Sequence, residues 1–245
     1  MQQFLYPKVE AFIGKYILTE GFFIDVFSSK DSYFDWAKLT LTDKLVNKIS
    51  INKNDEALIK FGYDNMYSVF GGNVTQYKDK EILCKDKMLQ LQNTKITSTF
   101  LNVYPQDIIK TGLITAGIKD YKLCEKYYVK KEKFIVANKT IIELIEQVHQ
   151  AWNVSQNFFF TPEEIFYWGA DGEKSNELFT FEYGENIITI SNEGTYWHLT
   201  TILAPFIRHS QFIKVEHPKV SGVFEVKKIH YHTTTEGLFR TEIYF

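Results

Sequence analysis

Two histidines one residue apart, His230 and His232, form the pattern in this chain that is best suited to metal chemistry. Alternate residues of a β-strand point to the same face, so the two imidazoles would lie side by side, at a spacing that metal sites use. His209 and His217 precede them, but no cysteine or clear third ligand stands at a defined spacing from the pair. Polar residues at alternate positions are also what the solvent-facing side of a strand contains. We therefore expect a solvated strand face and no bound metal.

Three acids, Asp107, Glu163 and Glu164, are the candidates for a carboxylate pair of the kind that hydrolyses glycosides. They stand in the first turn of an expected helix and at the tip of an expected turn, where acids commonly cap the backbone or are solvated. The patterns GxSxG, GxGxxG, GxxxxGK[ST] and HExxH do not occur in the sequence. We therefore predict no catalytic residues, no cofactor and no enzymatic activity.

Aromatic side chains offer a different function, because Trp36, Trp168 and Trp197 could stack on sugars. Tryptophan in a β-protein more often belongs to the core, so a carbohydrate- or receptor-binding β module is the alternative hypothesis. The two cysteines, Cys84 and Cys124, have no CxxC spacing and cannot form a zinc site on their own. We expect both to be reduced thiols.

The composition is that of a globular chain with a charge close to neutral. Hydrophobic residues make up 44% of the 245 residues, and aromatics make up 16%, an excess that favours strands. A formal net charge of −2 provides no long-range field that would attract DNA or an anionic membrane. The basic cluster at 126–133 is interrupted by apolar residues and an acid, so we expect a solvated loop or strand edge. With no signal peptide and no apolar run of ~20 residues, we expect a soluble protein made in a cytoplasm.

Hydrophobic periodicity predicts strands, then helices, then strands. A period of two over 37–42, 59–63 and 69–74 predicts strands, with a bulge or bend at Gly71-Gly72 and a last strand at Leu89–Gln92. Pro105 begins one predicted helix that stops at Gly117, and Thr140 begins a second with Glu143 completing a capping box.

The strand pattern returns after this helical region. We expect a hairpin around Pro162 and a closing hairpin whose turn lies at 233–237. Phe224 and Val226 have one parity and Ile229 and Tyr231 the other, which predicts a bulge near Lys227-Lys228. The predicted fold is mainly β with a small α-helical insert (α+β) and two β-barrel domains: 1–101, the insert 102–154, and 155–245.

Three strings of this sequence resemble a family of tail proteins. They are the closing hairpin 221–243, with Gly222, Phe224, Val226 and His230 before the turn, the 102–118 segment with its helix, and the strands from Asp35 to Val74. In this order they are similar to the late-control or baseplate-hub proteins of contractile-tailed phages and related injection devices. The strings are spread between residue 35 and residue 243, and none of them is a catalytic signature. Many hubs are longer, so this chain would be a reduced version.

The resemblance implies a structural role in the baseplate of a phage or prophage tail. Hubs of this family carry two similar barrels per subunit and assemble as homotrimers, so that the ring has near-sixfold symmetry. Such a ring joins the tail tube protein to the central spike protein and lines the channel for the tape-measure protein and DNA. The expected location is the virion tail, assembled in the host bacterial cytoplasm. DNA would be passing cargo, and no membrane would be a partner.

Overall fold

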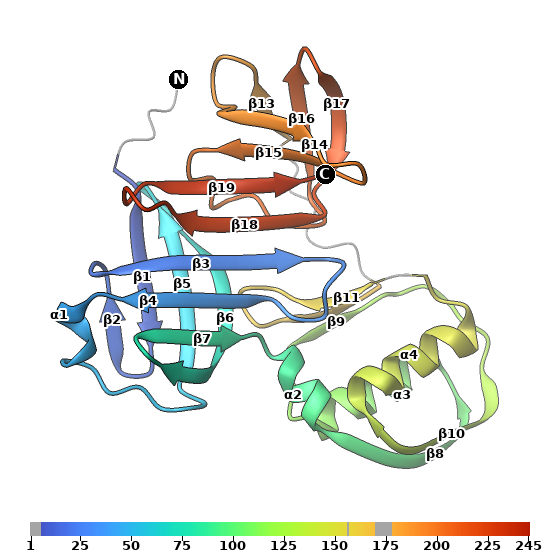
Figure 1. Cartoon of the computed structure of the whole chain (residues 1–245). Coiled ribbons are helices and arrows are strands. Elements are labelled where there is room, and N and C mark those ends of the chain that lie inside the picture. Colours follow the sequence, from blue (N-terminus) through green and yellow to red (C-terminus); the bar gives the residue numbers. More distant parts are fainter. Residues whose placement is uncertain (1–5, 156, 170–177) are drawn as a thin grey trace. The chain divides into compact units, whose positions relative to one another are not determined.

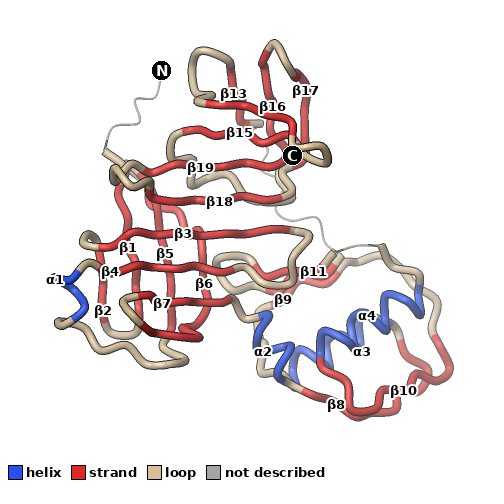
Figure 2. Tube along the Cα trace, viewed as in Figure 1, coloured by secondary structure: helices blue, strands red, loops and turns tan. Residues whose placement is uncertain are grey.

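The computed structural model describes residues 6–155, 157–169 and 178–245, which divide into two compact units (Figure 1). The first, which we call the β unit, is built from both ends of the chain, residues 1–86 and 171–245. The second, the insert unit, is the continuous stretch 87–170. Figure 2 shows that nearly all of the helix belongs to the insert unit, since the described residues of the β unit include only the short α1 (Asp43–Val46).

An antiparallel sheet of eleven strands forms the body of the β unit. It unites strands from both ends of the chain, because β18 near the C-terminus pairs with β3 near the N-terminus, with Tyr231 opposite Val26 (Figure 1). From one edge to the other the strands are β14 (Thr189–Asn192), β15 (Trp197–Thr201), β19 (Phe239–Tyr244), β18 (Lys228–Thr233), β3 (Phe22–Ser29), β4 (Trp36–Leu41), β7 (Glu81–Lys85), β6 (Met66–Lys78), β5 (Glu56–Gly62), β1 (Lys8–Ile13) and β2 (Tyr16–Leu18).

The junction between β3 and β18, which we call the seam, bears directly on the predicted fold class. The mainly β class is confirmed, but the described sheets are not closed into barrels, and two barrel domains are not confirmed. Alternation in a sequence indicates which residues of a strand are buried, whereas it says little about which strand lies beside it. The strands predicted at 37–42, 59–63 and 69–74 therefore exist, and the two β segments pair with each other through β3 and β18.

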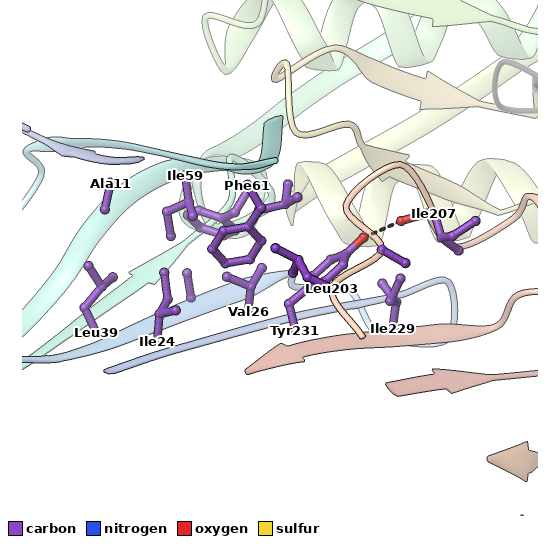
Figure 3. Packing of buried hydrophobic residues seen from close by; sticks show 14 of the residues in the cluster. Ala11, Ile24, Val26, Leu39, Ile59, Phe61, Leu203, Ile207, Ile229 and Tyr231 are labelled. Carbon is purple, nitrogen blue, oxygen red and sulfur yellow. Dashed lines mark hydrogen bonds between the residues drawn. The ribbon is translucent and has the colours of Figure 1, made fainter. Parts of the chain in front are cut away.

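A single hydrophobic core spans the seam. Phe61 of β5 is fully buried, and its ring lies 5.7 Å from the rings of both Tyr231 and Phe239. The hydroxyl of the buried Tyr231 donates a hydrogen bond to the carbonyl oxygen of Ile207, as Figure 3 shows. Residues from the N-terminal and C-terminal strands thus share one buried cluster, and neither set buries its apolar face alone.

A smaller sheet in the β unit contains β13 (Phe179–Glu182), β16 (Phe212–His217) and β17 (Val220–Glu225). The chain leaves this sheet at the end of β17 and enters the large sheet at Lys228, where β18 begins. The predicted change of side-chain parity is present, since Val226, Ile229 and Tyr231 are all buried. The prediction of a bulge within one strand was wrong, because Val226 and Lys227 link strands of two different sheets.

The insert unit packs two helices beside an antiparallel pair of strands, β8 (Lys95–Val103) and β10 (Lys131–Thr140). Helix α3 (Pro105–Thr115) begins at the predicted proline and is followed by Gly117 in a left-handed conformation, with φ of 76°. Helix α4 (Ile141–Trp152) has the predicted capping box: Thr140 Oγ1 accepts from the Glu143 amide, and the Glu143 carboxylate accepts from the Thr140 amide. Both helix predictions are confirmed.

One predicted strand in this unit was wrong. Leu89–Gln92 lies within helix α2 (Met88–Asn93), in which Met88 and Leu91 are the buried residues. These two are three residues apart, the spacing of neighbours on one face of a helix, whereas the four-residue alternation of leucine and glutamine is too short to distinguish the two periods.

The predicted hairpin around Pro162 is confirmed. Strands β11 (Phe158–Phe160) and β12 (Phe166–Trp168) form an antiparallel hairpin, and β12 also pairs with β9 (Tyr121–Leu123). The Glu164 amide donates to the Thr161 carbonyl oxygen across the turn, which places Pro162 at its second position.

The bulge predicted at Gly71-Gly72 is displaced, because both glycines pair regularly with β5 and the register of β6 shifts at Val69 and at Thr75. The register thus shifts on either side of the two glycines, and a side chain at Gly72 would collide with the Lys85 carbonyl. Of the helices in the described residues, none is long and apolar enough to cross a membrane.

Candidate functional site

The most chemically unusual surface of the described residues is one face of the sheet formed by β15, β19, β18 and β3, which lie side by side in Figure 2. Alternation along β18 sends Ile229 and Tyr231 into the core, so His230 and His232 project from the opposite face. We call the group of Asp25, His198, His230, His232 and Glu242 the histidine face. The sequence predicted that the two β18 imidazoles share a face, and the strand confirms it.

Glu242 provides the third ligand that the sequence did not reveal. It lies directly opposite His230 in the β18–β19 pairing. Its carboxylate oxygens lie 3.2 Å from His230 Nδ1 and 3.9 Å from His232 Nδ1. One donor atom from each of these three residues can be chosen so that all lie within 4.8 Å of one another. His230, His232 and Glu242 are therefore the described residues that could hold a metal ion.

Asp25 of β3 completes the group from the other side of β18. It lies opposite His232 in the pairing, and its Oδ1 is 3.3 Å from His230 Nε2. Burial alone would lower the pKa of His230, but hydrogen bonds and charges from Asp25 and Glu242 outweigh it and raise this pKa to about 9. The hydrogen bond from His230 is the main cause that lowers the pKa of both carboxyl groups. His230 is thus held as a cation between two carboxylates.

His232 and His198 differ from His230 in their surroundings. Burial, the largest cause, lowers the pKa of His232. His198 lies on β15, with its Nδ1 3.1 Å from Glu193 and its ring stacked 4.5 Å from Tyr244. His232 Nδ1 and His198 Nε2 are buried and have no hydrogen-bond partner among the residues that the structure describes. Each of these two nitrogens therefore has a lone pair or an N–H group that makes no hydrogen bond within the described part of the chain.

Aromatic rings form one wall of this group. Trp36 stacks on Phe27 at 5.6 Å, and both rings lie within 6.4 Å of the His230 ring. The other two tryptophans of the sugar-binding alternative lie elsewhere: Trp168 is fully buried in the insert unit and donates to His149, and Trp197 is half-buried on β15. Trp168 is therefore core, and none of its ring is available to stack on a sugar.

The three candidate acids occupy structural positions. The carboxylate of Asp107 accepts a hydrogen bond from the Tyr104 amide at the start of α3. Glu163 and Glu164 lie in the turn between β11 and β12, and Glu164 pairs with Lys87 at 2.7 Å. Of the other histidines, His209 is buried and His217 stacks edge-on against Tyr183. Cys84 and Cys124 are free thiols.

The sequence analysis missed three members of the histidine face: Glu242, Asp25 and His198. None of them stands at a distance in sequence from the His230-x-His232 pair that would mark it as a ligand. The predicted closing hairpin contained a signal for the first of them. In a two-stranded antiparallel ladder the register determines which residue lies opposite His230, and here it is Glu242. Asp25 and His198 come from strands that only the long-range pairing of the sheet brings near.

The chain has the fold of phage tail proteins over 97% of its length, although no family model matches it and no curated protein matches its sequence significantly. It is similar to the 43 kDa tail protein of prophage MuSo2 from Shewanella oneidensis, at 11% identity and a TM-score of 0.74, over 97% of each chain. It is also similar to a tail protein from Neisseria meningitidis, at 10% identity and a TM-score of 0.76, over 97% of this chain and 95% of that one.

A third similar structure widens the class. It is an Escherichia coli protein described as a component of the type VI secretion system with structural similarity to the T4 tail proteins gp27 and gp5. The likeness has 10% identity and a TM-score of 0.65, and it covers 96% of this chain and 75% of that protein. At these identities the comparisons show the fold. The resemblance to tail proteins that the sequence indicated is confirmed at that level.

Proposed function

We propose that this chain is a structural hub subunit of a phage or prophage tail baseplate. Three copies would form a ring with near-sixfold symmetry that joins the tail tube to the central spike. The observation that carries the proposal is the extent of the fold likeness, which covers nearly all of this chain and nearly all of two tail proteins. An inserted domain or a shared supersecondary motif would not match over both complete chains. The partners are therefore the chain itself, the tube protein, the spike protein and the tape-measure protein.

The chain supplies two β blocks for such a ring, one on each side of the insert. The N-terminal block contains β1–β7 and the C-terminal block contains β13–β19, and the two meet at the seam. Three chains would place six blocks around the channel. Such a ring would satisfy both a sixfold tube above it and a threefold spike below it. We retain the proposal that the two β segments, 1–101 and 155–245 in the sequence, act as similar tube-like elements.

Exposed apolar side chains on both blocks suit permanent contacts between subunits. Val223 of β17 and Phe212 of β16 are 55% and 48% exposed, and Ile17 of β2 and Phe23 of β3 are 62% and 42% exposed. A head-to-tail ring needs two different complementary patches per subunit. Permanent interfaces of this kind commonly bury more than about 2,000 Å² and are rich in apolar side chains.

The near-neutral charge suits a channel wall. A formal net charge of −2 would let DNA pass as cargo without the salt-dependent binding that a basic excess produces. We propose that the chain has no catalytic turnover and that it is located in the virion tail after assembly in the host cytoplasm. Two of the three carboxylates considered for hydrolysis, Asp107 and Glu164, take part in a helix cap and an ion pair.

Electron microscopy of the chain co-expressed with the tail tube and spike proteins of the same phage or prophage tests this function. We expect threefold rings stacked on a tube end. Phe212→Glu should prevent ring formation, because it would bury a charge in the interface. Lys219→Glu, an exposed charge reversal in the turn between β16 and β17, is the matched control and should leave the rings intact. Twofold particles, or isolated subunits with every neighbour present, would contradict the proposal and favour the receptor-binding module.

A further inference from the structure

We propose that the histidine face binds one divalent transition-metal ion, best fitted by zinc, through His230, His232 and Glu242. The inference rests on the chemistry and geometry of this face and is independent of the assembly role proposed above. The sequence offered no third ligand for His230 and His232, and for that reason we expected no bound metal. The fold supplies this ligand, Glu242. The two imidazoles come from β18 and the carboxylate from the neighbouring β19.

The distances suit a small ion. Zinc binds imidazole nitrogen and carboxylate oxygen at about 2.0–2.2 Å, which places neighbouring ligand atoms about 3–4 Å apart. Glu242 Oε2 is 3.2 Å from His230 Nδ1, and Glu242 Oε1 is 3.9 Å from His232 Nδ1. A small rotation of the side chains would bring the two nitrogens onto one ion. The regular strand pairing fixes the backbone positions from which all three side chains project.

The unsatisfied nitrogens are a second, independent observation. His232 Nδ1 is buried without a hydrogen-bond partner in the described part of the chain, and it faces the carboxylate of Glu242. A buried polar atom normally has a partner, and each exception requires an explanation. A metal ion between His232 and Glu242 would supply this partner. The same holds for His198 Nε2, which lies 3.8 Å from Glu242 Oε2 and next to the remaining coordination position.

The outer ring of contacts also has the arrangement of a metal site. Histidine ligands usually donate their second N–H group to a carboxylate, which fixes the ring and increases its basicity. His230 Nε2 faces Asp25 at 3.3 Å, and an ion at Nδ1 would displace the proton that this nitrogen shares with Glu242 Oε2, releasing it to solvent. His198 Nδ1 likewise faces Glu193 at 3.1 Å. Asp25 would therefore be a positioning residue, and its loss should weaken binding without removing a ligand.

The donor set selects the class of ion. Two imidazoles and one carboxylate suit zinc and its first-row neighbours, whereas calcium and magnesium prefer oxygen ligands alone. Three protein ligands leave a fourth position for water or for His198. Bound there, the ion would link β18 to β19, and through Asp25 to β3 across the seam. Its effect would be to stabilise the junction between the two β blocks.

The test is a zinc titration of the chain produced without a polyhistidine tag and stripped with a chelator, followed by calorimetry. We expect one zinc ion per chain and an increase in the unfolding temperature when zinc is present. His232→Gln and Glu242→Gln should each weaken binding at least tenfold and abolish the increase. Asp25→Asn should weaken binding about 10- to 100-fold, as expected for a second-shell partner. His217→Gln, on the surface of the smaller sheet, is the matched control and should bind as the unaltered chain does.

Circular dichroism without metal distinguishes lost binding from lost folding. Glu242→Gln keeps the shape of the side chain, and His232 Nδ1 has no hydrogen-bond partner in the described residues to lose, so both variants should keep the spectrum of the unaltered chain. The proposal is overturned if the folded, unaltered chain binds no zinc. It is equally overturned if binding is unchanged in both His232→Gln and Glu242→Gln, because the ion would then be held elsewhere.

Discussion

The insert unit and the β unit use the chain in opposite ways. The insert unit is one continuous stretch, and its helices begin at Pro105 and Thr140, where local signals place them. The β unit is assembled from both ends of the chain, and its two blocks are joined by the pairing of β3 with β18. Local sequence therefore accounts for most elements of both units, with α2 (Met88–Asn93) as an exception, whereas long-range pairing determines the architecture of only the second. The variants below test this difference.

The largest effect is expected at the seam. Phe61→Ala should lower the free energy of unfolding by about 3–5 kcal/mol, because it removes a fully buried ring that contacts Tyr231 and Phe239. Hydrogen exchange should show that β3 and β18 lose protection together. Phe23→Ala, a control at a 42% exposed position of β3, should have an effect below about 1 kcal/mol. If only the N-terminal strands lose protection, the two blocks are independent and the shared core is refuted.

A pH-dependent effect is expected at His209, which is buried in the β unit. Burial, followed by the charges of Lys30 and Arg208, lowers its pKa to about 4, although Glu225 and Asp31 act in the opposite direction. Its folded pKa lies below the unfolded value, so the stabilisation is complete above about pH 6.5 and is lost as the pH falls towards 4. The slope for one such group is at most about 1.4 kcal/mol per pH unit.

Denaturant titrations between pH 4 and 7 measure this contribution. In His209→Gln the unfolding free energy should fall less steeply with decreasing pH. The slope should be smaller by at most the contribution of one titrating group. His217→Gln, a histidine replacement on β16 in the same unit, is the matched variant with which the slope of His209→Gln is compared. An unaltered slope in His209→Gln would mean that the buried imidazole is not the group that responds to acid.

The smallest effect is expected in the insert unit. Thr140→Ala removes the side chain that accepts from the Glu143 amide and should cost about 1 kcal/mol. Because this cap acts locally, hydrogen exchange should increase in the first turn of α4 and leave β3 and β18 unchanged. Thr111→Ala on the exposed face of α3 is the control and should be neutral or slightly stabilising. Loss of protection throughout the β unit would show that the two units do not open separately.

The same contrast explains how much of the fold could be predicted from sequence. The capping box at Thr140, the turn at Pro162 and the closing hairpin all depend on residues close in sequence, and all are confirmed. The passage between sheets at Val226 was predicted as a bulge, because a change of parity looks the same in both cases. The seam between β3 and β18 has no local signature, since an alternating strand does not specify its neighbour.

The histidine face was predicted in part for the same reason. The shared face of His230 and His232 follows from the two-residue period of one strand, and the hairpin register places Glu242 beside them. Asp25 is 205 residues from His230 in the sequence, and only the seam brings the two side chains close. Ligand sets gathered from distant strands are visible in a fold and cannot be found by spacing.

The copy number of the chain in its complex tests the central proposal most directly. Native mass spectrometry should be applied to the chain co-expressed with the neighbouring tube and spike proteins. The hub assignment predicts three copies of the 28.8 kDa chain in each complex. Two copies, or a single copy when every neighbour is present, would contradict the ring.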